Sequence, residues 1–329
     1  MTDALDRASA SRSGGESILT RPFPFGVDAD TGERVNLSLS HFLTSYWVHG
    51  QIGIGKSNHV LAPIYRTLTS PLPGTMFDGA GALTANTFNA VACIAARRMA
   101  YADYLPEART QAANFVLKHP HIVFGDSARN ISIDLLASQR LPNGERETWE
   151  QVALRTYQIF NRIFADDADK RVRFRRVAMS ILAVLIGGRR PIREYKLLLE
   201  ARPTRRGEAD PAGVFLAFCL REAERLGIAP CDRPFYRDQV QAFLQLRRMT
   251  PRDFTQEVGS TDNALAFFHS SPGADYVNDQ TLNLPWLLEH GGKLLLSHTL
   301  GDLGLATVLF RAYDSILRTW IRCPFGSHA

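Results

Sequence analysis

The chain has 329 residues, of which 45% are hydrophobic and 22% are charged, and its formal net charge is +5. These values are those of an ordinary folded protein, and they exclude a disordered, collagen-like or disulfide-scaffold class. The four cysteines show no CxxC spacing, so we expect neither a disulfide framework nor a zinc site, and the predicted location is a reducing cytoplasm. The modest positive charge permits an anionic partner without requiring one.

The start of the chain is polar and rich in Ser, Ala and Gly, without the apolar segment of a signal peptide. Residues 1–20 are therefore predicted to form a disordered leader. The longest apolar run, Ala178 to Gly188, is far shorter than the roughly 20 residues that a membrane-spanning helix needs. We expect this run to be a buried helix, and the protein to have no membrane span of its own.

The first predicted elements are strands. Apolar and polar residues alternate over Arg34 to Ser40, after a turn signal at Asp28 to Gly32. Phe42 to His49 is rich in aromatic and β-branched residues and ends at a glycine. A helical pattern follows from Lys56 to Leu68. The order is therefore strand, glycine loop and helix.

Further α/β alternation follows this helix. Thr75 to Asp78 and His121 to Phe124 have the composition of short strands, and Ala85 to Leu105 between them has helical spacing. Such alternation predicts a mostly parallel sheet.

After Glu147 the pattern of apolar residues changes from alternating strands and helices to helices alone. The helical patterns follow one another without a strand signal between them: Trp149–Phe164, Val172–Ile186, Ala212–Leu226 and Phe235–Leu246. Lys293 to Leu296, followed by a helix to about Trp320, predicts a return to the sheet. The expected division is a nucleotide-binding core over residues 21–145, a helical subdomain over 146–280, and a return to the core sheet with a C-terminal helix over 281–329.

One motif points to chemistry. Residues 50–57 read GQIGIGKS and match G-x-x-x-x-G-K-[ST] at every fixed position. In such a loop, glycines let backbone N–H groups curl around phosphate oxygens at the start of a helix. Lys56 would reach the β- and γ-phosphates as a catalytic residue, and the Ser57 hydroxyl would bind Mg²⁺. We predict that ATP is bound by Gly50, Gln51, Ile52, Gly53, Ile54, Gly55, Lys56, Ser57 and Asn58.

A P-loop ATPase also needs an acid at a strand end to hold Mg²⁺ through water. No stretch of four apolar residues followed by Asp-Glu occurs. Asp78, at a predicted strand end, is the candidate catalytic acid, and Asp302 is a second candidate. The alternative for Asp78 is that it only caps a turn, or contacts ribose or metal indirectly. Ile163 to Asp167 also ends in two acids, but it lies within a helical pattern.

The stretch from Pro24 to about Leu136 resembles the nucleotide-binding core of the HerA/FtsK-like P-loop ATPases, nearest to the TraG/TraD-type coupling ATPases of conjugation and type IV secretion. The similar segments are PFGVD, GQIGIGKS, TMFDGAG and NISIDL, the last beginning at Asn130. The resemblance implies a RecA-like P-loop fold with an inserted helical domain, and a motor that works with ATP, Mg²⁺, DNA and other subunits. The sequence shows neither the family's membrane-spanning segment nor its Walker B acid, so we expect an incomplete or hydrolysis-poor motor.

A basic segment runs from Lys170 to Arg206 and holds only two acids, Glu194 and Glu200. Such a segment would attract the phosphates of DNA, or could be a solvated helical face. Assembly into a homo-oligomer or a secretion-system complex is the other partnership expected.

Two further functions stay open. The chain could be a P-loop kinase-like enzyme acting on a small molecule, with the helical subdomain as a lid. It could also be a non-catalytic interaction protein that keeps a nucleotide site. His49, beside the loop, could contact nucleotide or simply be packed. Glu289, His290 and His298 lack the spacing of a metal site, and none is predicted.

Overall fold

The computed structural model divides the chain into two compact units. Unit 1 combines Met1–Val123 with Leu284–Thr299, and unit 2 combines Phe124–Asn283 with Leu300–Ala329. The structure describes residues 22–28, 30–38, 61, 64–65, 67–68, 74–79, 81–100, 107–126, 131–139, 144–160, 168–200, 203, 208–269, 273–278, 281–300 and 303–322. The predicted leader and the predicted strand over residues 42–49 lie outside this part of the chain.

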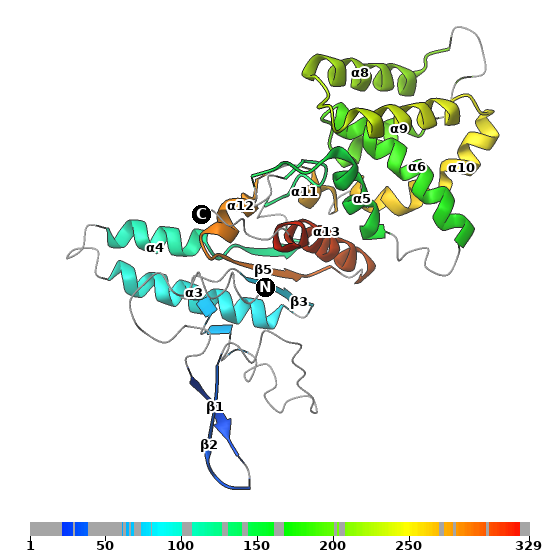
Figure 1. The fold of residues 1–329 in the computed structure, drawn as a ribbon. Coiled ribbons are helices and arrows are strands. Elements are labelled where there is room, and N and C mark those ends of the chain that lie inside the picture. Colours follow the sequence, from blue (N-terminus) through cyan, green and yellow to red (C-terminus); the bar gives the residue numbers. More distant parts are fainter. Residues whose placement is uncertain are drawn as a thin grey trace. The chain divides into compact units, whose positions relative to one another are not determined.

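Unit 1 begins with an antiparallel hairpin of β1 (Phe23–Val27) and β2 (Arg34–Leu37), drawn in dark blue in Figure 1. The side chain of Asp28 shapes the turn, because its Oδ1 accepts hydrogen bonds from the backbone N–H groups of Asp30 (3.0 Å) and Thr31 (2.8 Å). The turn and β2 agree with the sequence prediction. The sequence does not predict β1, because its proline and glycine lower strand propensity.

A three-stranded sheet in the order β3-β5-β4 lies in unit 1. β3 (Gly74–Asp78) pairs in parallel with β5 (Lys293–His298). On its other side β5 meets β4 (His121–Phe124), and the N–H of Leu295 donates to the carbonyl of Pro120 at 3.0 Å. β5 is buried along nearly all its length, as expected of a central strand that is covered on both faces. The predicted parallel sheet is confirmed, and β5 is its latest strand in the sequence.

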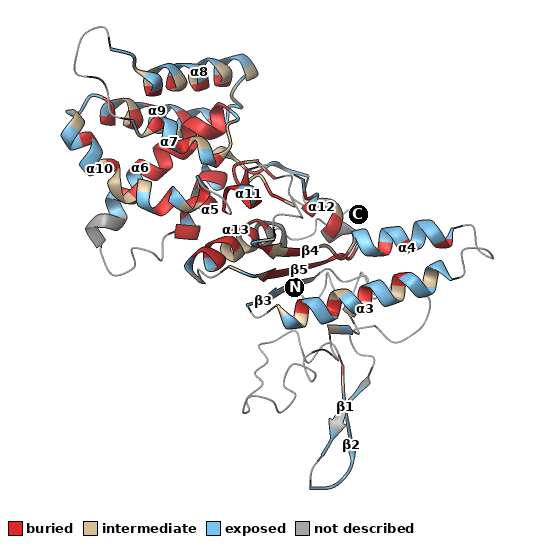
Figure 2. Cartoon of the chain, turned by 180° about the vertical axis from the view of Figure 1, so that it is seen from behind, coloured by how far each residue is buried: buried red, intermediate tan, exposed pale blue. Residues whose placement is uncertain are grey.

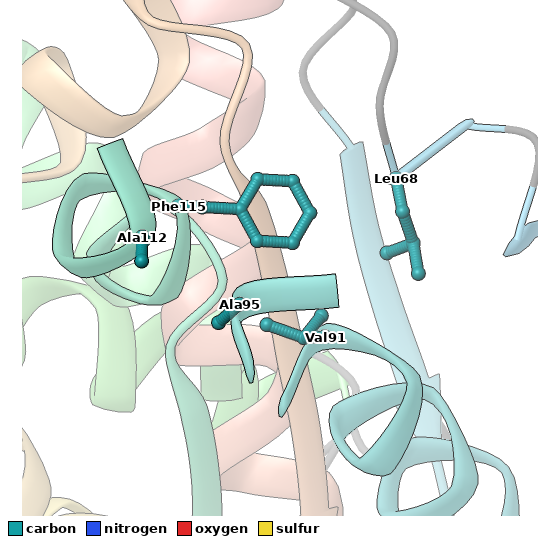
Figure 3. Packing of buried hydrophobic residues seen from close by; sticks show 5 residues of the cluster. All are labelled: Leu68, Val91, Ala95, Ala112 and Phe115. Carbon is teal, nitrogen blue, oxygen red and sulfur yellow. The ribbon is translucent and has the colours of Figure 1, made fainter. Parts of the chain in front are cut away.

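Helices α3 (Ala82–Met99) and α4 (Ala108–Leu117) pack against each other and form the core of unit 1 with the described helical residues near Leu68. Figure 3 shows the cluster: Leu68, Val91, Ala95, Ala112 and Phe115. Its small alanine side chains let the two helices approach closely. The predicted helix over 85–105 is thus α3, which begins and ends earlier. The sequence does not predict α4, because most residues on its buried face are alanines. The helical spacing of large apolar residues, by which a helix is recognised, is therefore missing.

Unit 2 is mainly helical. α6 (Ala168–Gly187) lies at its centre, with its apolar half buried (Figure 2), and packs against α5, α8, α9 and α10. This confirms that the longest apolar run is a buried helix. The helices of this unit are α5 (Trp149–Phe160), α7 (Tyr195–Leu198), α8 (Pro211–Leu226), α9 (Arg233–Leu246), α10 (Pro251–Leu265), α11 (Ala274–Val277) and α13 (Leu303–Arg322), with 3-10 turns η3 (Ile192–Glu194) and η4 (Ala266–Phe268).

Local sequence explains where the helices of unit 2 begin. α8 starts at Pro211, and the side chain of Asp210 accepts a hydrogen bond from the N–H of Gly213 at 2.9 Å. α10 begins in the same way, with a proline at its first position and the side chain of Thr250 as the N-terminal cap. Proline fits the first turn because that N–H has no partner within the helix. Within the described residues, no helix is both long enough and apolar enough to cross a membrane.

A buried ion pair anchors a turn segment of unit 2. Arg155 of α5 is 6% exposed and Glu147 is 3% exposed, and Nε and Oε1 lie 2.9 Å apart. A second bond joins Nη2 of Arg155 to Oε2 of Glu147 at 3.1 Å. The same guanidinium donates to the carbonyl oxygens of Leu135 (3.1 Å) and Ala137 (3.3 Å). Arg155 therefore holds the segment around residues 135–137, the end of the predicted NISIDL motif, against α5.

Candidate functional site

Polar side chains form a row across the sheet of unit 1. Two of them, Asp78 and Ser297, lie near the carboxyl ends of β3 and β5, where ligands bind in open parallel α/β sheets, and the third, His121, begins β4. Asp78 ends β3 and lies opposite Ser297 of β5. Nε2 of His121, on β4, lies 3.1 Å from Oγ of Ser297. α3 covers this face, since the ring of Phe88 lies 5.5 Å from that of His121. We call Asp78, Ser297 and His121 the polar row.

Asp78 ends its strand as predicted, and its carboxylate caps the helix that follows. Oδ2 accepts hydrogen bonds from the N–H groups of Leu83 (2.8 Å) and Thr84 (3.0 Å), in the first turn of α3. These donors have no partner within the helix, and the negative charge suits a helix N-terminus. Gly81 makes the tight entry possible with a φ of 77°. The structure thus gives Asp78 the capping role, and its catalytic role stays a prediction.

Replacing Asp78 by alanine is expected to destabilise the protein by about 1–2 kcal/mol, because two N–H groups lose their acceptor. Asp78→Asn keeps an acceptor and should lose less. Urea unfolding followed by circular dichroism measures the difference. Asp30→Ala, at an exposed turn position, is the matched control and should change stability by a few tenths of a kcal/mol at most. Equal stability of Asp78→Ala and Asp30→Ala would contradict the capping role.

The second contact of the polar row pairs a serine hydroxyl with an imidazole, which in other settings forms the first half of a nucleophilic site. Ser297 is only 2% exposed. α3 also passes close by, since a side chain placed at Gly81 would meet Cβ of Ser297 at 3.9 Å. A substrate therefore has no access to this hydroxyl, and the contact serves to join β4 to β5 beneath α3.

The predicted nucleotide-binding residues, Gly50–Ser57 and Asn58, lie outside the described residues, as do His49, Asp302 and the stretch Ile163–Asp167. The structure does describe residues of the helix predicted to follow the loop. These residues are in helical conformation and end at Leu68: Leu61, Ile64, Tyr65, Thr67 and Leu68. Leu68 is 2% exposed and belongs to the core of unit 1.

A buried histidine contacts this helix from the turn between α4 and β4. Nε2 of His119 lies 3.2 Å from the carbonyl oxygen of Leu68, and Nδ1 lies 2.6 Å from that of Phe115. Burial is the main cause that lowers the pKa of His119, and the charges of Lys293 and Lys118 lower it further, although both carbonyl contacts act in the opposite direction. Burial and the charge of Lys118 also lower the pKa of Lys293, to about 8.

The basic segment of unit 2 is partly neutralised by the fold. Arg176 pairs with Glu257 of α10. Lys196 pairs with Asp262 of the same helix, with Nζ 2.5 Å from Oδ2. Arg190 pairs with Glu194 at 2.6 Å. Four other arginines of the segment have exposed side chains: Arg173, Arg175, Arg189 and Arg193. The fold thus leaves fewer cations for a polyanion than the sequence suggests, and the predicted contact with DNA stays a prediction.

The histidines near β5 have local partners. Nδ1 of His290 lies 2.8 Å from the carbonyl oxygen of Trp286, on α12 (Leu284–Glu289), and its ring stacks on the indole at 4.8 Å. His298 ends β5. Across the described ranges, no group of three His, Cys, Asp or Glu side chains is arranged to hold a metal ion.

Sequence reasoning did not single out His119, His121 or Ser297. One sequence feature could have drawn attention to the two histidines: the triplet His119-Pro120-His121, in which they flank a proline at the start of a strand. Their partners, Leu68 and Ser297, are distant in the sequence, so no spacing rule indicates the contacts.

Comparison with known protein families, curated proteins and solved structures finds no match to this chain.

Proposed function

We propose that this protein binds Mg²⁺-ATP through the loop Gly50–Ser57, on a RecA-like P-loop core, as a motor-type NTPase related to the DNA translocases and coupling proteins of conjugative or type IV secretion systems. The observation that carries the proposal is GQIGIGKS followed by helical residues and then by a parallel strand that ends in an acid. A loop between a strand and a helix is the setting in which this motif binds phosphates.

The arrangement of the sheet supports the same proposal. The helical residues of unit 2 come mostly between β4 and β5 in the sequence. β5 then lies between β3 and β4. A helical domain inserted into a parallel α/β core is what the resemblance to coupling ATPases implies.

In the proposed site the backbone N–H groups of the loop, together with Asn58 at the start of the helix, bind the phosphates. Lys56 contributes a point charge to the β- and γ-phosphates, and the hydroxyl of Ser57 contacts the Mg²⁺ that accompanies the nucleotide. Bound Mg²⁺ neutralises charge on the phosphates. These contacts explain binding without assigning a residue that activates water.

A second candidate, a non-catalytic nucleotide-binding protein, is favoured by the geometry of Asp78. Its carboxylate accepts two N–H groups of α3. An acid that caps a helix is poorly placed to serve a bound metal ion unless that contact breaks. This candidate predicts nucleotide binding without turnover.

Calorimetric titration of the full chain with Mg²⁺-ATP tests the proposal, and an absence of binding would reject it. Phosphate release, measured with and without DNA, separates the functions that remain. Stimulation by DNA supports the motor, and binding without release supports the non-catalytic protein. Consumption of ATP only when small-molecule acceptors are added would indicate a kinase-like enzyme.

A further inference from the structure

The contacts of His119 demand more protons than a neutral imidazole carries. Its two ring nitrogens face the carbonyl oxygens of Phe115 and Leu68, at 2.6 Å and 3.2 Å. Both partners only accept hydrogen bonds, and a neutral imidazole has a single N–H. Only the imidazolium can donate to both carbonyls, so the neutral ring leaves one carbonyl without a proton.

The surroundings of His119 oppose that second proton. The residue is 1% exposed, and a charged ring is unfavourable in such a site. Lys118, from the end of α4, and Lys293, from β5, add positive charge nearby. On the α3 side, the guanidinium of Arg98 lies 4.2 Å from the ring centre of Phe115, which itself packs 4.5 Å from the imidazole. The two carbonyls and the two lysines therefore act in opposite directions on one proton.

The two hydrogen bonds are not equivalent. The bond to Phe115 is the shorter, and it stays within one stretch of chain, from α4 to the turn that follows. The bond to Leu68 spans 51 positions and reaches the helical residues that follow the glycine loop. If the neutral ring keeps its proton on Nδ1, facing Phe115, then Nε2 has no proton to donate to Leu68.

We propose that His119 is a positioning residue for the nucleotide site: its protonated ring adds a hydrogen bond to Leu68 and so fixes the helical residues that follow the glycine loop more firmly than core packing alone. The inference rests on the proposed function. These helical residues are fixed most firmly when both carbonyls receive a proton, so nucleotide binding and proton uptake at His119 favour each other. Because such linkage is reciprocal, bound nucleotide favours the protonated ring by the same factor by which protonation favours nucleotide.

The test measures the dissociation constant of Mg²⁺-ADP for the full chain between pH 8 and pH 5, a range that extends to acid pH because burial lowers the pKa of His119. A net hydrogen bond contributes about 0.5–1.5 kcal/mol, which corresponds to roughly twofold to tenfold in affinity. We expect wild type to gain affinity toward pH 5 by about this factor, relative to His119→Gln, which cannot gain a proton. His290→Gln, at an exposed histidine of unit 1, is the matched control and should keep the wild-type profile.

A second variant separates positioning from simple packing. Lys293→Met removes the nearby charge while keeping a long side chain, so the midpoint of the pH profile should move to higher pH. Thermal melts check that each variant is folded. Parallel profiles for wild type and His119→Gln, or a midpoint unmoved by Lys293→Met, would overturn the role of His119 while leaving nucleotide binding intact. If wild type binds no nucleotide at any pH, the proposed function itself fails.

Discussion

Lys56→Ala is expected to weaken the binding of Mg²⁺-ATP by about tenfold to a hundredfold and to remove any ATP turnover. The ammonium is the one side-chain charge that the motif directs at the β- and γ-phosphates, and a hydrogen bond to a charged group contributes about 1.5–3 kcal/mol. The variant keeps the backbone N–H groups of the loop, so weak binding of Mg²⁺-ATP should remain. Isothermal titration calorimetry gives the affinity, and phosphate release in the presence of DNA gives the turnover.

Lys196→Ala is the matched control for Lys56→Ala. Lys196 is a partly exposed lysine of unit 2 that pairs with Asp262, and its removal should change neither quantity. Equal affinities of wild type and Lys56→Ala would remove the loop from the proposed site. Equal rates of phosphate release, with altered affinity, would remove only the ATPase activity.

The largest decrease in stability is expected for Arg155→Ala, at about 3–5 kcal/mol. The substitution leaves the carboxylate of Glu147 buried without its cation, and an unpaired buried charge is strongly unfavourable. The carbonyl oxygens of Leu135 and Ala137 each lose one donor as well. Chemical denaturation followed by circular dichroism gives the free energy of unfolding.

Two variants check the cause of that decrease. Arg176→Ala breaks an ion pair whose arginine is 55% exposed, and it should change stability by no more than about 1 kcal/mol. The double variant Arg155→Met with Glu147→Leu removes both charges, so it should unfold less readily than Arg155→Ala. If the double variant is the less stable of the two, the buried charge is not the cause.

Much of the fold follows from local patterns in the sequence. The strands at Thr75–Asp78 and His121–Phe124, the late strand at KLLL and the main helices of unit 2 were predictable, because apolar residues recur there at the period of a strand or a helix. The helices and strands not predicted are β1, α4, α10 and the short helices α7, α11 and α12. β1 contains proline and glycine, and α4 buries small residues in place of large ones.

The site was less predictable than the fold, for a physical reason. The glycine loop is recognisable because its chemistry depends on consecutive residues. The contacts of Asp78, His119 and the ion pairs of the basic segment depend on which elements become neighbours. Glu257 and Asp262 lie far along the chain from Arg176 and Lys196, so a segment that looks strongly basic in the sequence carries much less uncompensated charge after folding.

The position of β5 bears on how the protein is made. The strand between β3 and β4 is the last of the three to leave the ribosome, more than 160 residues after β4 ends. Until then β3 and β4 have no strand to join them, and pairing over so long a separation is slow. The nascent chain therefore exposes two unpaired strand edges while the helices of unit 2 are being synthesised, and this interval is when chaperone binding or misassembly is most to be expected.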